Sequence, residues 1–119
     1  WKIYGDSKRK MKEFITNLYQ NIEKLQNIVD KIKNNQPYIE DLKQYIPSMN
    51  QIIQMIFNMA EDNKVQLQIN NQFVIQVLKD TLYGIEHEDP VFLQDVLQYG
   101  MLEIYKYIID ELEDGVIYE

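Results

Sequence analysis

The stretch from Asp89 to Leu112, DPVFLQDVLQYGMLEIYKYIIDEL, decides the fold that we expect for this chain. Asp89 can accept hydrogen bonds from the free N–H groups of a first helical turn, and Pro90 suits the next position because its fixed φ is already helical. Apolar residues then recur at spacings of three and four: Leu93, Leu97, Gly100 or Met101, Ile104, Ile108 and Leu112. This spacing predicts an amphipathic helix over residues 90–114.

The apolar surface of this helix is broader than one neighbouring helix would cover. Six more apolar residues flank the main row: Phe92, Val96, Tyr99, Leu102, Tyr105 and Ile109. A helix with so wide an apolar arc needs several partners, which the rest of the chain must supply.

Three upstream segments have apolar residues at similar helical spacings. Their apolar rows are Met11, Ile15, Leu18, Ile22, Leu25, Val29 and Ile32, then Ile39, Leu42, Ile46, Met49, Ile53, Ile56 and Ala60, then Phe73, Val74, Val77, Leu78, Thr81, Leu82 and Ile85. These rows predict helices over 7–34, 37–61 and 71–87. We expect Asp6 or Ser7 to cap the first helix, Pro37 to open the second, and Asn70 or Asn71 to cap the third.

Pro47 lies inside the second predicted helix. The heptad phase runs through Pro47 without a skip, which favours a kink, or a break with immediate restart, within one rod. The alternative is a short helix over 37–46 followed by a separate helix from Ser48.

The connections are short, so neighbouring helices should be antiparallel. Gly84 and the residues after Glu86 predict a tight turn between the third and fourth helices. Residues 65–69 alternate between apolar and polar, but a lone strand would have no partner. We expect instead an extended connector, with Val65, Leu67 and Ile69 closing one end of the core. We also expect the tail from Gly115 to stop the fourth helix.

The predicted fold class is therefore all-α. It is a single domain of residues 1–119 built as an antiparallel up-down-up-down four-helix bundle.

Composition limits the functional classes. The 119 residues are 45% apolar and 26% charged, which is typical of one globular domain. Cysteine is absent, so disulfides, a thiolate nucleophile and a Cys-based zinc site are excluded. The apolar runs are far shorter than the roughly 20 residues that cross a bilayer. We therefore expect no membrane span. A net charge of −7 repels phosphate backbones, so we also expect no nucleic-acid partner.

Charge is concentrated at two helix ends. Lys2, Lys8, Arg9, Lys10 and Lys12 lie at the start of the first helix, and Asp110, Glu111, Glu113, Asp114 and Glu119 at the end of the last. Each cluster opposes its own helix dipole, but in an up-down-up-down bundle the two clusters are neighbours and offset each other. The alternative is a basic partner-docking patch of Lys8, Arg9, Lys10 and Lys12.

Metal and catalytic motifs are largely missing. A di-iron bundle needs two Glu-x-x-His pairs, whereas the only histidine, His87, lies in an acidic turn; this favours a solvated histidine over a metal ligand. Helical nucleotide pyrophosphatases hold magnesium with carboxylate pairs. Glu86 with Asp89 and Glu111 with Asp114 match half of that spacing. We therefore expect no catalytic residue, no cofactor and no bound metal.

A second apolar strip on the fourth helix is the candidate partner-binding site, namely Tyr99, Gly100, Leu102, Tyr105 and Ile109. Left exposed, it would bind another helix or a second copy of the chain as a homodimer. Gly100 has two interpretations, because glycine in a helix costs about 1 kcal/mol relative to alanine. It marks the close approach of a neighbouring helix, or the floor of a groove for a peptide.

The segment from Val77 to Tyr99 has an acidic turn followed by an apolar-Leu-x-Asp-x-Leu-x-Tyr pattern, here Phe92, Leu93, Asp95, Leu97 and Tyr99. It resembles a family of small uncharacterised helical proteins of low-GC Gram-positive bacteria. This chain has Gly100 where the family pattern tends to have Glu. The resemblance implies a cytoplasmic helical protein and no particular chemistry.

Two functional hypotheses follow. The first is a non-enzymatic protein–protein interaction module, an adaptor, chaperone-like protein or assembly factor that binds a protein partner or itself. The second is a small metal-dependent nucleotide hydrolase that uses the clustered carboxylates.

Overall fold

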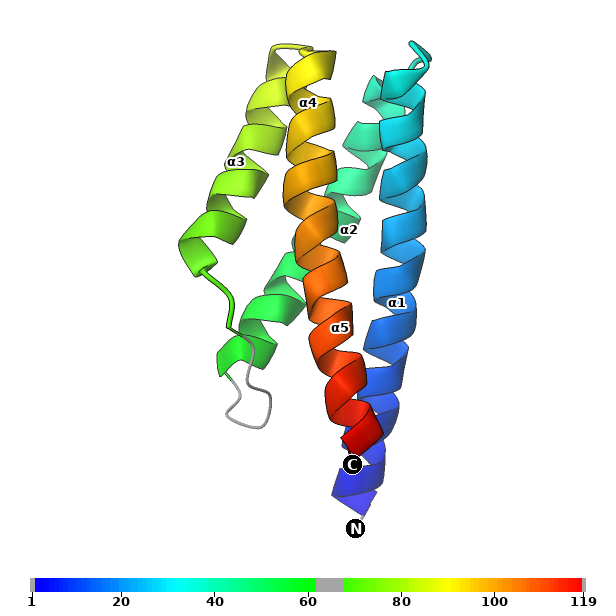
Figure 1. The fold of residues 1–119 in the computed structure, drawn as a ribbon, viewed down its shortest axis with the longest axis vertical. Helices are drawn as coiled ribbons and strands as arrows, with labels where there is room; N and C mark the ends of the chain where they lie inside the picture. Colours follow the sequence, from blue (N-terminus) through cyan, green and yellow to red (C-terminus); the bar gives the residue numbers. More distant parts are fainter. Residues whose placement is uncertain (1, 62–67, 119) are drawn as a thin grey trace.

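The computed structural model describes the backbone of residues 2–61 and 68–118 and the side chains of residues 9–59 and 68–113. The helical elements are α1 (Lys2–Lys33), α2 (Ile39–Glu61), α3 (Asn71–Glu86), α4 (Pro90–Val96), the π-helical turn η1 (Leu97–Met101) and α5 (Leu102–Tyr118). The elements α4, η1 and α5 follow one another in a single rod (Figure 1). The described part contains no strand, and the all-α prediction is confirmed.

The outer helix ends differ from the prediction. The first helix starts at Lys2 rather than near residue 7, so Asp6 and Ser7 lie inside it and do not cap it. The last helix continues to Tyr118, so the expected stop at Gly115 is wrong. Both errors have the same origin, because residues that favour a helix end in isolation are also tolerated inside a helix.

The end of α1 and the course of α2 follow from local chemistry. Asn35 has a φ of +54°, and the N–H of Gln36 donates to the carbonyl of Lys31 at 2.8 Å, which closes the last turn of α1. The helix α2 is continuous through Pro47, so the alternative of two separate helices is wrong. The kink at Pro47 stays a prediction.

The α3–α4 hairpin has the caps that the sequence predicts at its helix starts. The side chain of Asn70 accepts from the N–H of Phe73 at 3.3 Å, and that of Asp89 accepts from the N–H of Phe92 at 3.1 Å. The left-handed residue of the turn is Glu88, with a φ of +48°. Gly84 lies in the last turn of α3, and its carbonyl accepts from the N–H of Asp89 at 3.1 Å, so it takes part in closing the turn, as predicted.

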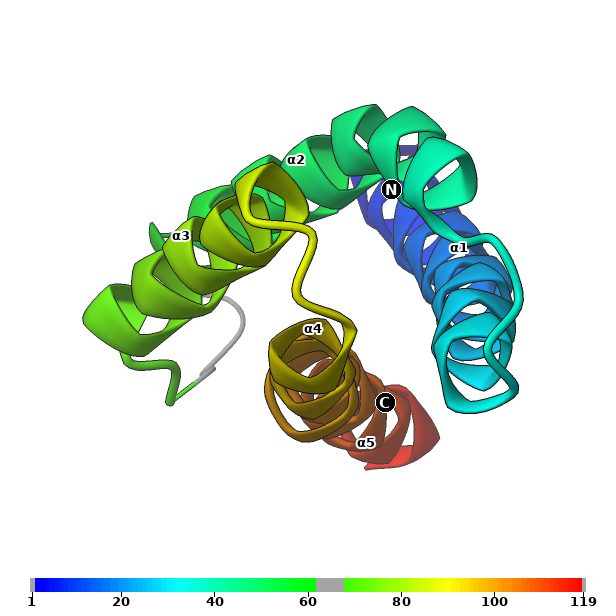
Figure 2. The ribbon, with the colours of Figure 1, turned by 90° about the horizontal axis from the view of Figure 1, so that it is seen from above.

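The helices surround one elongated core, and the molecule measures 51 × 24 × 21 Å. The rod of α4, η1 and α5 packs against α1 on one side and against α3 on the other, while α2 crosses behind from α1 to α3 (Figures 1 and 2). The start of α1 and the end of α5 lie at the same end of the molecule (Figure 1). The helix α3 lies at the outer edge in both views.

Every helix contributes buried side chains to the core. Its fully buried members include Leu18, Leu25, Leu42, Met49, Ile52, Ile56, Leu93, Leu97, Met101, Leu102, Tyr105 and Ile108. Ile69 is half-buried against this core, as the connector prediction requires, whereas Val65 and Leu67 fall outside the described residues. Within the described residues, no helix combines the length and the apolar character needed to cross a bilayer.

Candidate functional site

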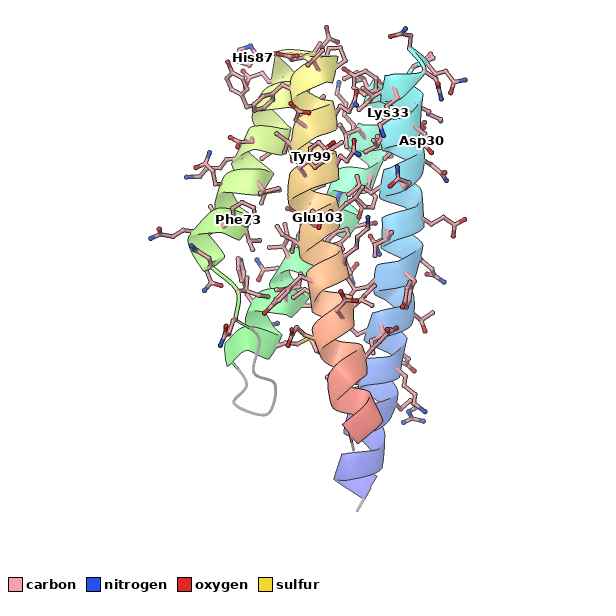
Figure 3. All side chains as sticks on the ribbon, viewed as in Figure 1. Asp30, Lys33, Phe73, His87, Tyr99 and Glu103 are labelled. Atoms are coloured by element: carbon pink, nitrogen blue, oxygen red, sulfur yellow. The ribbon has the colours of Figure 1, made fainter. Side chains whose placement is uncertain are left out.

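The predicted partner-binding strip is mostly buried. Only Tyr99 lies on the surface, with 66% of its area exposed (Figure 3). Gly100, Leu102, Tyr105 and Ile109 are buried in the chain's own core. The expectation that these four residues stay exposed is therefore wrong.

The π turn explains part of this error. The N–H of Leu102 donates to the carbonyl of Leu97, five residues earlier, so η1 contains one more residue per turn than an α-helix. Three consecutive residues, Gly100, Met101 and Leu102, are buried as a result. The rod thereby faces α3 at η1 and α1 along α5.

Two glycines allow α3 and the rod to approach closely. A Cβ on Gly100 would lie 3.1 Å from Cγ1 of Val77, and a Cβ on Gly84 would lie 2.7 Å from Cγ of Leu93. The interpretation of Gly100 as a site of close helix approach is thus confirmed. Gly100 is buried under Val77, so it forms no open groove floor.

A polar network crosses the core between α1, α2 and α5. The hydroxyl of Tyr45 donates to Oδ1 of Asn21 at 2.9 Å and lies 2.9 Å from the hydroxyl of Tyr105. The single hydroxyl proton of Tyr45 is used on Asn21, so Tyr105 donates to Tyr45. Nδ2 of Asn21 donates to the backbone carbonyl of Asn17 at 2.7 Å. No buried side-chain nitrogen or oxygen among the described residues lacks a partner.

Burial makes both phenols of this network weak acids. It raises the pKa of Tyr105 to about 12, and burial together with the neighbouring Tyr105 raises the pKa of Tyr45 above its usual value. Neutral, hydrogen-bonded and enclosed side chains of this kind hold helices in register. The network is therefore structural.

The start of α1 and the end of α5, which carry the two charge clusters, lie at the same end of the molecule (Figure 1). Arg9, Lys10 and Lys12 of the predicted basic patch are exposed on α1, and the side chain of Lys8 is outside the described set. Further along α1, the hydroxyl of Tyr19 donates to Oε1 of Glu113, and this bond raises the pKa of Tyr19. The direct offset of the two charge clusters stays a prediction.

The acidic turn holds His87 against an aromatic ring. The ring centroids of Tyr83 and His87 are 4.1 Å apart, and His87 is exposed (Figure 3). Asp89 caps α4 with its carboxylate, which gives it a structural role. Among the described residues, no three His, Asp or Glu side chains gather as a metal-binding group. Glu111 is exposed, and the side chain of Asp114 lies outside the described set.

The exposed apolar surface lies mainly on α3 and the start of the rod. Seven large apolar side chains are exposed in the described part: Tyr19, Phe73, Ile75, Leu82, Tyr83, Val91 and Tyr99. Six of them belong to α3, α4 and η1. Figure 3 labels Phe73 on α3 and Tyr99 on the rod.

Four residues of α3 form a row at spacings of three, four and three, which we call the α3 stripe: Ile75, Leu78, Leu82 and Ile85. Ile75 and Leu82 are 41% and 46% exposed, whereas Leu78 and Ile85 are half-buried against the core. The sequence prediction placed Leu78, Leu82 and Ile85 in one row with the buried residues Val74, Val77 and Thr81, and it did not include Ile75. The signal that separates them is that α3 has two apolar rows of the same spacing, one position apart.

Comparison of the chain with protein-family models, with curated proteins and with solved structures finds no match. The fold therefore defines only a class, an all-α protein with an apolar surface on its edge helix.

Proposed function

We propose that this chain is a non-enzymatic protein–protein interaction module, with the role of an adaptor, chaperone-like protein or assembly factor. The observation that carries the proposal is the gathering of six exposed large apolar side chains on α3, α4 and η1. Exposed apolar surface of this kind marks interaction sites when it is contiguous along one element. The proposal moves the binding surface from the buried strip of α5 to the outer side of the hairpin.

The proposed context is a cytoplasmic protein with an up-down-up-down bundle architecture in which α2 is skewed. The alternating chain direction and the short α3–α4 turn support this architecture. The resemblance to small helical proteins of Gram-positive bacteria supports the cytoplasmic location.

Capture of a protein partner tests the proposed function. Wild-type protein should retain one partner at a fixed stoichiometry, and replacing Val91 and Tyr99 by Ser should abolish retention because both side chains are exposed. Tyr19→Ser is the matched control, since Tyr19 is an exposed aromatic residue on α1. Equal retention by all three proteins contradicts the proposal.

An activity assay tests the hydrolase alternative. Magnesium-dependent turnover of nucleoside triphosphates, lost in Glu111→Gln, would replace the interaction module with the nucleotide hydrolase. No arrangement of carboxylates among the described residues favours that function.

A further inference from the structure

The α3 stripe has the form of one half of a helix–helix contact. Its four residues repeat at the spacing with which one helix packs along another. The inner row of α3, from Val74 to Gly84, already packs against α4 and η1. The stripe is a second row, and Ile75 and Leu82 leave about half of their area in solvent.

The position of α3 leaves room for a further helix. It lies at the outer edge of the molecule, packed mainly against α4 and η1 and more lightly against α2 (Figures 1 and 2). A helix laid on the stripe would cover the exposed parts of Ile75 and Leu82 and complete the burial of Leu78 and Ile85.

The charge of the α3–α4 hairpin selects the partner. Residues 71–96 carry five acidic side chains and one basic side chain, a net charge of −4, whereas residues 1–70 carry a net charge of +2. The stripe ends beside the exposed residues Glu86, Glu88 and Asp89. Lys79 is the single basic residue of α3.

Charge complementarity therefore favours a basic occupant over a second copy. Two copies that met through α3 would bring two hairpins of net charge −4 against each other, which opposes association. A helix with apolar residues on one face and Lys or Arg around it would bury the stripe and neutralise the acidic turn. Electrostatic attraction of this kind also accelerates binding at low salt.

We propose that the α3 stripe binds a basic amphipathic helix of another protein, with the basic residues next to Glu86 and Glu88. This inference rests on the proposed function and names the chemistry of the partner. Its occupant is an apolar face at three-four spacing flanked by positive charge.

A pair of designed peptides tests the proposal. One is a fluorescent Leu/Lys peptide of about 18 residues, long enough to cover α3, and the other has Glu at every Lys position. Fluorescence anisotropy should show binding of the Leu/Lys peptide to the full chain and at least tenfold weaker binding of the Leu/Glu peptide. Equal binding of both peptides overturns the requirement for a basic partner.

Two variants locate the binding site. Ile75→Gln with Leu82→Gln should weaken binding of the Leu/Lys peptide about tenfold or more. The control, Tyr19→Gln, removes a large exposed side chain on α1, outside the proposed binding surface, and should change binding less than about twofold. Urea unfolding of both variants checks that each remains folded. Equal weakening by the two variants overturns the location.

The charge of the turn is tested separately. Glu86→Gln with Glu88→Gln should weaken binding about threefold at low salt and less at high salt, because exposed charges are screened. An unchanged affinity at low salt contradicts the placement of the basic residues at this turn.

Sedimentation distinguishes the competing occupant. A concentration-dependent dimer that disappears in the Ile75→Gln, Leu82→Gln variant would identify the occupant as a second copy and overturn the proposal. The proposed function is judged independently, by partner capture with the Val91 and Tyr99 variants. Loss of capture there, together with no binding of the Leu/Lys peptide, would sustain the interaction module and reject the basic helix.

Discussion

The hydroxyl oxygens of Tyr45 and Tyr105 lie 2.9 Å apart in the core, although the two residues are 60 positions apart in the chain. Tyr45 occupies the middle of the network, because it donates to Asn21 and accepts from Tyr105. The two phenols are therefore unequal. Removing the middle hydroxyl leaves two neighbours without a partner, whereas removing the terminal one leaves Tyr45 bonded to Asn21.

We expect Tyr45→Phe to lower the free energy of unfolding by about 3 kcal/mol and Tyr105→Phe by about 1 kcal/mol. An unsatisfied buried polar group costs about 1–3 kcal/mol, and a lost hydrogen bond with no orphaned partner costs less. Urea unfolding followed by circular dichroism measures both values. Tyr99→Phe is the control, and its effect should be close to zero because this phenol is exposed. Equal losses for Tyr45→Phe and Tyr105→Phe contradict the assigned direction of the hydrogen bonds.

The same burial predicts a loss of stability at alkaline pH. An unfolded tyrosine releases its proton near pH 10, whereas Tyr105 in the folded chain does so near pH 12. Between these values the unfolded state binds fewer protons than the folded state, so the free energy of unfolding falls as pH rises. Tyr105 alone should remove about 3 kcal/mol over this interval, and its full contribution is retained below pH 10.

Urea unfolding at pH 9 and pH 11 tests this dependence. The wild type should lose more stability than Tyr105→Phe over this interval, because the variant lacks the contribution of Tyr105 and keeps only that of Tyr45. Titration of tyrosinate absorbance should show late-ionising phenols that disappear on unfolding. A pH dependence that is identical in wild type and Tyr105→Phe argues against the raised pKa of Tyr105.

Periodicity predicted the helices well because burial of one face dominates their formation. It predicted the buried row of α1 less well. The sequence favoured Met11, Ile15 and Ile22, which are half-buried, whereas the enclosed positions include Phe14 and Asn21. Asn21 interrupts an otherwise apolar row from Phe14 to Ile32. A buried polar residue in such a row can be predicted only when its hydrogen-bond partner is known. The partner of Asn21 is Tyr45, which lies on another helix.

The candidate site could not be predicted because exposure depends on packing between elements. The fourth predicted helix has an apolar arc that packs against α1 and α3, and Tyr45 of α2 bonds to Tyr105, so Leu102 and Tyr105 are core residues. The π turn at η1 is not encoded by spacing alone. Three residues of the α3 stripe, Leu78, Leu82 and Ile85, were in the predicted apolar row of this helix, but only the edge position of α3 identifies the stripe as surface.

The contacts of Gly84 with Leu93 and of Gly100 with Val77 predict different effects of alanine at the two buried glycines. Alanine gains about 1 kcal/mol of helix propensity over glycine, while overpacking costs about 1–3 kcal/mol. A Cβ on Gly84 meets the enclosed Leu93 at 2.7 Å, so Gly84→Ala should destabilise the fold by about 1–2 kcal/mol. A Cβ on Gly100 meets Val77 at 3.1 Å, so Gly100→Ala should be nearly neutral.

A double-mutant cycle checks the cause at Gly84. In a Leu93→Ala background the closest side chain is gone and Cδ1 of Phe92 remains 3.1 Å from the added Cβ, so Gly84→Ala should become nearly neutral. Urea midpoints of the four proteins provide the coupling. A loss on Gly84→Ala that persists unchanged without the Leu93 side chain would assign the effect to the backbone instead.

Glu88, in the turn between α3 and α4, has a backbone conformation that favours glycine. Its φ of +48° is a left-handed conformation, which a residue with a Cβ adopts at a cost of about 1 kcal/mol and glycine adopts without that cost. Glu88→Gly should therefore raise the free energy of unfolding by about 0.5–1 kcal/mol, even though glycine has more freedom in the unfolded chain. Glu88→Ala is the matched control, because it removes the same carboxylate and keeps the Cβ. Thermal unfolding of the two variants separates the contributions, and a gain that is equal in Glu88→Ala would trace the effect to relief of acidic repulsion beside Glu86 and Asp89.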